Sequence, residues 1–276
     1  MTDGKSEMDR SNERRGPAPL RGEAVLSVQT WQAQRLVNGR KGRDGKPAIV
    51  GLTGFAHRTQ LVWQAAQEDD PYADWFLIRI EDALDEAKME VRRQEETVRE
   101  VLTVMDGIRL EVAESVQPGE VPLRFPNPYG YMGAYLLADF DRLTRTILSA
   151  RHFALLDRDR MAAILNGTGR RIRSTFILPM GWRHTGVVRK DLAQMNQLAA
   201  RAIEAMGKPP QEVIERKRRA RHAPPIREAS WTEAAENEDM RDVEEAKDPD
   251  QADGEIETED SEEPERGATW KEKLFK

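Results

Sequence analysis

Hydrophobic residues recur at helical spacing over long stretches of the chain, most clearly within residues 74–105. The repeat there has a period of seven residues and consists of Leu84, Val91, Val98 and Met105. Such a heptad is typical of a helix that pairs with a second copy of itself, or of one that packs against its own domain. The second interpretation is favoured because the run is short and Gln94 interrupts it.

Further amphipathic segments predict a chain of helices. Over about 133–156, Leu136, Phe140 and Ile147 share one side of a helix, and Arg145 lies on the other. The same reasoning predicts shorter helices at 31–38, 53–67, 157–165, 191–206 and 209–221.

Alternation of apolar and polar residues predicts a few short strands. The first covers 23–30, and a β-hairpin is predicted from 108–112 and 121–125, joined through a Pro-Gly turn. Two more strands are predicted at 170–178 and 185–189. The sequence therefore predicts an α+β fold that is predominantly helical, with a β-hairpin and short strands.

The end of the folded region has its own order of elements. A strand at 185–189 is followed by a helix, a turn at Gly207 and a second helix through Arg221. This order is required by a ribbon–helix–helix unit, in which the strand pairs with its counterpart in a dimer and the ribbon contacts DNA. The two helices alone also fit a helix–turn–helix. The pattern does not separate these two interpretations.

Composition divides the chain into three parts. Its 276 residues are 38% hydrophobic and 33% charged, whereas globular domains average about 45–50% and about 25%. Residues 1–19 are polar and rich in charge, Gly and Pro, and residues 228–276 are dominated by Asp and Glu, so both are predicted to be disordered. A folded domain is predicted over 20–227.

The net charge of the chain is −6, but the charged residues are distributed unevenly along it. Residues 229–276 contain 18 acidic and 6 basic residues, a net of −12, whereas residues 141–228 contain 19 basic and 8 acidic residues, a net of +11. A concentrated positive field favours a polyanionic partner. The sequence therefore indicates double-stranded DNA as the partner of the basic segment.

Two groups of basic residues are the candidate DNA contacts. The first, which would hold phosphates, consists of Arg216, Lys217, Arg218, Arg219 and Arg221. The second consists of Arg171 and Arg173, which a strand would present to base edges in the major groove. The alternative is that both are ordinary solvated surfaces. The DNA interpretation depends on these cations being free of neighbouring carboxylates.

Catalytic and metal-binding patterns are weak. The chain has no Cys, its four His residues suit no common zinc spacing, and Asn166–Arg171 lacks the Gly-Lys-Ser/Thr ending of a phosphate loop. The acidic pairs Asp139/Asp141 and Asp157/Asp159 leave open a metal-dependent nuclease as a minor alternative. We therefore predict a protein that is not an enzyme and needs no cofactor. Without an apolar span or signal-peptide core, it is predicted to be cytoplasmic and not membrane-bound.

The acidic tail supports an alternative function. Trp270, Leu274 and Phe275 lie at its tip, among lysines, and resemble a short peptide that becomes ordered on a protein partner. The chain would then be a protein-interaction component of conjugative transfer or recombination machinery. The other interpretation of the tail is a segment that aids solubility or competes with DNA for the basic surface.

Several short sequence motifs resemble those of one protein family. They are Trp31–Leu36, Pro47–Phe55, Asp69–Trp75, Pro122–Gly133, Ala150–His152 and Arg221–Pro224. Together they are similar to the AcaB-like family of integrating conjugative elements and related plasmids, over roughly residues 20–227. The resemblance implies a cytoplasmic bacterial protein of a mobile genetic element. For the namesake branch it implies a DNA-binding transcriptional regulator related to ribbon–helix–helix proteins.

These observations predict a DNA-binding transcriptional regulator, or accessory factor, of an integrating conjugative element or plasmid. A homodimer is expected. Because the resemblance assigns no DNA contact to individual residues, the seven candidate contacts rest on charge alone.

Overall fold

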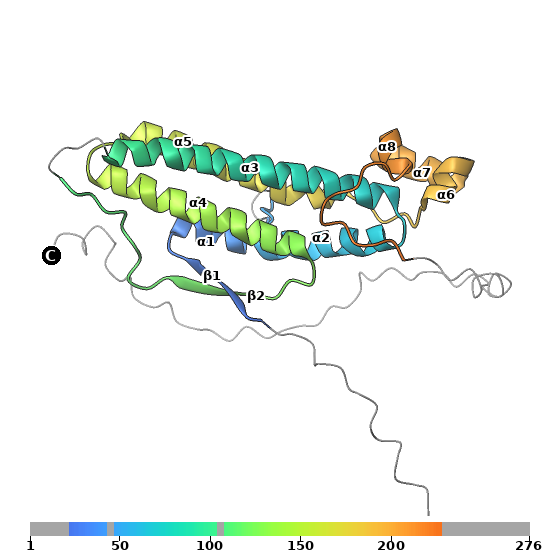
Figure 1. The fold of residues 1–276 in the computed structure, drawn as a ribbon, viewed down its shortest axis with the longest axis horizontal. Coiled ribbons are helices and arrows are strands. Elements are labelled where there is room, and N and C mark those ends of the chain that lie inside the picture. Colours follow the sequence, from blue (N-terminus) through green and yellow to red (C-terminus); the bar gives the residue numbers. More distant parts are fainter. Residues whose placement is uncertain (1–21, 43–46, 104–107, 228–276) are drawn as a thin grey trace, which may run out of the picture. The chain divides into compact units, whose positions relative to one another are not determined.

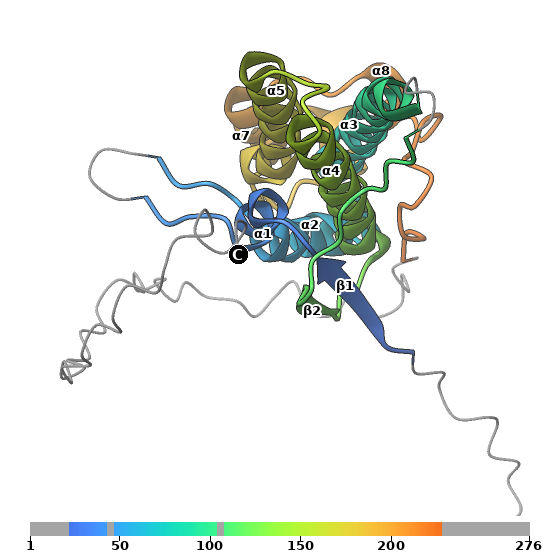
Figure 2. The ribbon, with the colours of Figure 1, turned by 90° about the vertical axis from the view of Figure 1, so that its left-hand side faces the viewer.

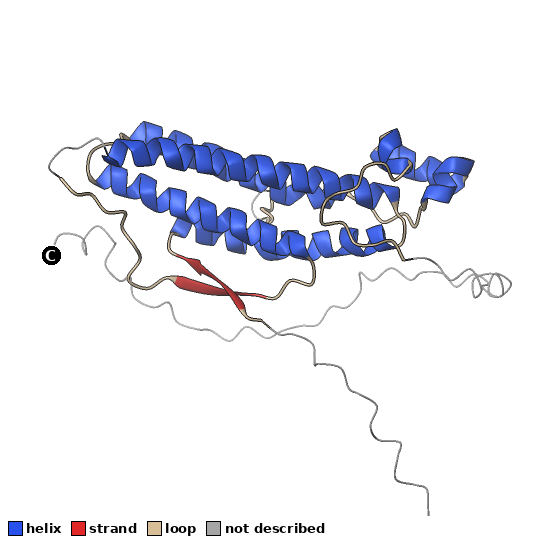
Figure 3. Cartoon of the chain, viewed as in Figure 1, coloured by secondary structure: helices blue, strands red, loops and turns tan. Residues whose placement is uncertain are grey.

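The computed structural model describes residues 22–42, 47–103 and 108–227. The chain divides into a unit of residues 1–228 and a unit of residues 229–276, and the described residues all belong to the first. Helices dominate them, and two short strands form an antiparallel sheet (Figure 3), which confirms a predominantly helical α+β fold. Among the described helices, none combines the length and apolar character that crossing a bilayer requires.

Five helices form the body of the fold (Figure 1). Helices α3 and α4 lie side by side, α5 contacts both, and α1 and α2 pack against α4. Their bounds are α1 Trp31–Asn38, α2 Leu52–Gln67, α3 Pro71–Thr103, α4 Pro128–His152 and α5 Arg158–Ile177. The helices predicted near 31–38, 53–67 and 74–105 are therefore confirmed within a few residues.

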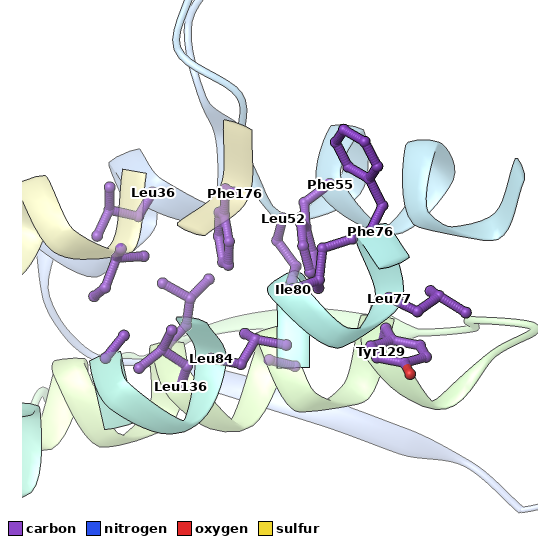
Figure 4. Packing of buried hydrophobic residues seen from close by; sticks show 14 of the residues in the cluster. Leu36, Leu52, Phe55, Phe76, Leu77, Ile80, Leu84, Tyr129, Leu136 and Phe176 are labelled. Carbon is purple, nitrogen blue, oxygen red and sulfur yellow. The ribbon is translucent and has the colours of Figure 1, made fainter. Parts of the chain in front are cut away.

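The core lies where these helices meet, and the close view in Figure 4 shows side chains from several helices converging on it. Phe55 of α2 stacks on Phe176 of α5 with ring centroids 4.8 Å apart. Of the heptad residues on α3, Leu84, Val91 and Val98 are buried within this core, and Met105 lies outside the described residues. Packing of the heptad against its own domain is thereby confirmed, because these side chains are not available as a dimer seam.

The sheet joins two segments that lie far apart in the sequence. Strand β1 (Ala24–Val28) pairs antiparallel with β2 (Gly119–Leu123). The predicted hairpin between 108–112 and 121–125 is therefore wrong, and 108–118 forms no strand. Instead, this segment packs against helix α4, and the Ala113 N–H donates to the Ser149 hydroxyl at 2.9 Å. This bond satisfies the Ala113 amide, and the Ser115 N–H donates to the Gln29 side chain at 3.0 Å.

Helix α5 corrects another prediction. The sequence predicts a helix that stops at Asn166-Gly167 and a strand over 170–178, but α5 is continuous to Ile177. Ile172 and Phe176, which alternate like strand residues, are also four apart and share the buried face of the helix. Asn166 and Gly167 lie on the exposed face and do not break it.

The last described elements are short. They are the 3-10 turn η1 (Leu178–Gly181), α6 (Arg189–Gln194), α7 (Gln197–Met206) and α8 (Gln211–Ile214). The expected strand at 185–189 is absent, so a ribbon–helix–helix order does not occur in this region. Met195 and Arg216 adopt left-handed backbone conformations, with φ of 50° and 58°. They interrupt the helices predicted at 191–206 and 209–221, so α8 is too short for the second helix of a helix–turn–helix.

A strand followed by two helices occurs instead at the beginning of the described residues, as β1, α1 and α2. Thr30 caps α1 and is itself held by Asp141 of α4, which accepts from the Thr30 N–H at 2.9 Å and from its hydroxyl at 2.6 Å. This contact fixes the start of α1 on the helical body. Helix α1 ends where Gly39 adopts a φ of 67°, a conformation that glycine adopts without steric strain.

Candidate nucleic-acid interface

The five basic residues at 216–221 do not form the end of a helix. Helix α8 stops at Ile214, and the chain then turns through Arg216 and runs along α3. We call residues 212–222 the C-terminal arm. It faces a row of acidic residues on α3 and the turn before it, so its charges meet carboxylates that lie some 140 residues earlier in the sequence.

Exposed cations of the arm are paired with these carboxylates. Arg216 contacts Asp69 at 2.7 Å, and Arg218 contacts Asp82 at 3.3 Å and Glu212 at 3.1 Å. Arg221 is paired with Asp85 and lies 3.5 Å from Glu81. Lys217 is 2.5 Å from Glu215, and its side chain is 73% exposed. Exposed ion pairs contribute about 0–1 kcal/mol, so a phosphate can replace the exposed carboxylates among them, whereas Glu81 is buried.

Arg219 has a different environment. Its guanidinium donates to both carboxylate oxygens of Asp74, at 2.9 Å each, and Asp74 is fully buried. Arg189, also buried, donates to the same carboxylate at 2.6 Å. Two arginines thus share one buried carboxylate, which ties the arm and α6 to the start of α3. Sequence reasoning missed Asp74 and Arg189 because neither belongs to a charge run of its own.

Arg171 and Arg173 lie on helix α5 rather than on a strand, and this separates them. Residues two apart on a helix point about 200° away from each other. Arg171 faces α3 and contacts Glu86 at 2.6 Å. Arg173 faces α1 and has no ion pair within the described residues. The expectation that both would lie on one face of a ribbon is wrong.

Six of the seven predicted DNA contacts are therefore ion-paired, and Arg173 is the exception within the described residues. Uncompensated charge was the argument for assigning these residues to phosphates, and it no longer applies to the arm as a whole. Contact of these residues with DNA stays a prediction. It is better supported for the exposed Lys217, Arg218 and Arg221 than for Arg219, whose side chain is 22% exposed.

Three of the four acidic residues considered for metal binding, Asp139, Asp141 and Asp157, are used in structural contacts. Asp139 accepts from Arg92 and Arg142, and Asp141 accepts from the amides of Gln29 and Thr30. Asp157 caps α5. Over residues 22–42, 47–103 and 108–227, no group of three or more His, Cys, Asp or Glu side chains could hold a metal ion.

The proposed docking peptide at Trp270, Leu274 and Phe275 lies outside the described residues. Its role as a protein-binding segment stays a prediction.

Comparison with known proteins gives two matches. A family model described as transcriptional regulator AcaB matches residues 16–227. Among solved structures, the chain is similar to the crystal structure of selenomethionine-containing AcaB from uropathogenic E. coli, with 13% sequence identity and a TM-score of 0.50. That similarity covers 71% of this chain and 95% of the other, and it concerns the fold. No curated protein matches the chain.

Proposed function

Because the chain belongs to the AcaB family of transcriptional regulators, we propose that it binds double-stranded DNA and regulates transcription from an integrating conjugative element or plasmid, in the bacterial cytoplasm. The observation that carries the proposal is the family match, which extends over all of the described residues. The proposal does not depend on which of the surfaces below contacts the DNA.

The phosphate contacts that we propose are the exposed cations of the C-terminal arm, Lys217, Arg218 and Arg221. Their side chains are 73%, 50% and 64% exposed. Their pairs with Glu215, Asp82 and Asp85 are of the weak exposed kind, while Arg221 also lies 3.5 Å from the buried Glu81. Each phosphate that replaces a carboxylate would release counterions from DNA, so binding would weaken steeply with salt. Arg219 would support this surface by fixing the arm on Asp74.

The order β1–α1–α2 would allow two copies of the chain to form a dimer through their β1 strands. Within the described residues β1 pairs only with β2, so its second edge is open to another strand. Leu26 and Val28 point into the core, and Val25 and Ser27 point outward. We propose that β1 of two copies pair along this edge, which would form a ribbon flanked by helices.

The direct experiment is a gel shift with promoter or transfer-origin DNA of the element that carries the gene. The variant K217Q/R218Q/R221Q removes the three exposed arm cations. We expect weaker binding and a smaller salt dependence, with the slope of log K against log salt reduced by about 0.9 for each lost phosphate contact.

A matched control removes three other ion-paired arginines. R92Q/R93Q/R99Q changes the net charge equally on α3, where the side chains are 58%, 68% and 57% exposed. This control is expected to bind DNA nearly as the unaltered protein does. Equal weakening in both triple variants would contradict the arm as a contact surface, and absence of any DNA binding at low salt would contradict the proposed function itself.

A further inference from the structure

A pocket of about 410 Å³ lies between helix α1, the segment that follows it, and helix α5. Figure 2 shows α1, α4 and α5 next to one another, with the segment after α1 extending away from them. Three arginines line this pocket, Arg35 from α1, Arg40 from the following segment and Arg173 from α5. We call it the α1–α5 pocket.

Two glycines set the position of Arg40. The backbone at Gly39 crosses that at Gly51 so closely that a Cβ on Gly51 would lie 2.5 Å from the Gly39 nitrogen. Just beyond the crossing, Arg40 and Ile49 exchange two backbone hydrogen bonds of 2.8 Å. The Arg40 guanidinium also donates to the Pro47 carbonyl at 3.1 Å. These contacts fix the base of the segment and hold Arg40 at the pocket wall.

Arg173 reaches the pocket across a glycine on its own helix. A Cβ on Gly169 would lie 3.3 Å from Nη1 of Arg173, so the missing side chain leaves space in which the guanidinium lies. The Arg173 side chain is half-buried, and within the described residues its guanidinium has no hydrogen-bond acceptor. Burial, and then the positive charges of Arg170 and Arg35, lower its pKa.

This environment contrasts with that of other partly buried arginines in the fold. Arg189, Arg219 and Arg145 all meet carboxylates, and Arg58 donates to the backbone carbonyls of Pro179 and Trp182. No described residue that lines the α1–α5 pocket is acidic. Arg35 and Arg40 are exposed, and Arg173 is half-buried. Partly burying Arg173 beside like charges without compensation costs folding free energy, and a bound anion would remove that cost.

The remaining walls suit an organic ligand. Leu36, Phe140 and Leu165 supply apolar surface, and Gln32 and Asn166 supply amide groups that can donate or accept hydrogen bonds. Small-molecule sites typically enclose about 300–1,000 Å³ and combine apolar walls with a few polar groups. Guanidinium groups match the geometry of phosphate oxygens and bind them through paired hydrogen bonds.

We propose that the α1–α5 pocket binds a phosphate group through Arg35, Arg40 and Arg173. A small phosphorylated molecule such as a nucleotide would place its phosphate among the three arginines and its organic part against Phe140 and Leu165. The DNA backbone is the second source of the same chemical group. The site does not depend on the C-terminal arm, because none of the arm residues lines it.

The test uses the full-length protein at low ionic strength, with pyrophosphate and ATP as probes in calorimetry and thermal unfolding. Both probes are expected to bind and to raise the unfolding temperature. R173Q is expected to lower the affinity at least about tenfold, which corresponds to the loss of one charge-assisted hydrogen bond. The free R173Q protein should unfold at the same temperature or higher, because the substitution removes like-charge repulsion.

R160Q is the matched control, since Arg160 is an exposed residue of the same helix outside the pocket. It should bind both probes as the unaltered protein does. No binding of either probe to the unaltered protein, or equal binding by R173Q, would overturn the proposal. R35Q provides a second test, and its effect on affinity should match that of R173Q in direction.

Duplex DNA separates the two sources of phosphate. If the backbone occupies the pocket, DNA should compete with pyrophosphate and R173Q should weaken the gel shift. If a small molecule is the ligand, ATP should bind R160Q normally whether or not DNA is present. Because the probe measurements need no DNA, failure of the phosphate site and failure of DNA binding give different results.

Discussion

At the scale of single residues, the environment of a charge decides what it does. Arg219 and Lys217 are two residues apart, yet one shares a fully buried carboxylate and the other lies in solvent. A buried ion pair that loses one partner leaves an uncompensated charge and costs about 3–5 kcal/mol, whereas an exposed pair costs about 0–1 kcal/mol. Substitutions in the arm therefore have to be chosen by burial and not by position in the basic run.

Asp70 gives a prediction of pH dependence. Its carboxylate accepts from the amides of Tyr72 and Ala73, at 2.8 and 3.1 Å, and burial raises its pKa from 3.8 to about 6. Because the folded state holds the proton more tightly than the unfolded state, this group favours folding below about pH 4. That contribution is lost as the pH rises to about 6, and amounts to about 3 kcal/mol.

The variant D70N keeps a side-chain oxygen for the two amides and carries no charge at any pH. It is expected to be more stable than the unaltered protein at about pH 7.5, by up to about 3 kcal/mol, and nearly equal at about pH 4. Urea unfolding across this range measures the difference. A difference between the two proteins that does not change with pH would show that Asp70 does not titrate in this way.

At the scale of elements, α5 shows why short apolar patterns mislead. Residues 170–178 alternate like a strand, but the same residues place Ile172 and Phe176 one helical turn apart. Asn166 and Gly167 have low helix propensity, yet each costs little on an exposed face when the rest of the helix is packed. Contacts of α5 with α3 and α4 supply that packing.

Gly167→Ala distinguishes the helix from the turn that the sequence predicts. A Cβ at this position meets no atom within 4 Å, and the backbone is helical. Alanine should therefore stabilise the protein by about 0.5–1 kcal/mol in denaturant unfolding. Gly130→Ala is the opposite control, because its Cβ would lie 2.4 Å from Cγ of Phe125 and must destabilise the fold. Destabilisation by Gly167→Ala would indicate a turn at this position.

At the scale of the whole molecule, charge balance differs from what the linear sequence indicates. Residues 141–228 carry a net charge of +11. The C-terminal arm at their end meets acidic residues between positions 69 and 86, and these carboxylates neutralise much of the arm's positive charge. Three arginines that have no acidic partner within the described residues, Arg35, Arg40 and Arg173, line the α1–α5 pocket. The distribution of compensated and uncompensated charge is thus a property of the fold.

The proposed dimer can be tested by closing the open edge of β1. Pro122 lies opposite Val25 and has no N–H, so that pair is not hydrogen-bonded and the Val25 amide points away from β2. Val25→Pro should therefore keep the β1–β2 pairing and prevent pairing with a second copy. Light scattering after size exclusion is expected to show a dimer for the unaltered protein and for Val25→Ala, and a monomer for Val25→Pro. A dimer that persists in Val25→Pro would exclude this edge.

The sequence by itself determined the helical elements with strong periodicity. The first three helices follow from local apolar spacing, which neighbouring residues decide, whereas Thr30 was placed in the preceding strand and its role as a helix cap was missed. The basic composition of residues 141–228 and the resemblance to the AcaB family could also be recognised from the sequence. The strand β1 could be recognised from its alternation, but its partner could not.

Only the tertiary structure decided which charges are compensated and which strands pair. Asp74 meets Arg219 across 145 residues of sequence, and β1 meets β2 across the three helices α1, α2 and α3. Coulomb interactions and strand pairing act between neighbours in space, and one-dimensional spacing carries no record of those neighbours. For this reason the sequence identified the arginines, and the fold separated those held by carboxylates from those around the pocket.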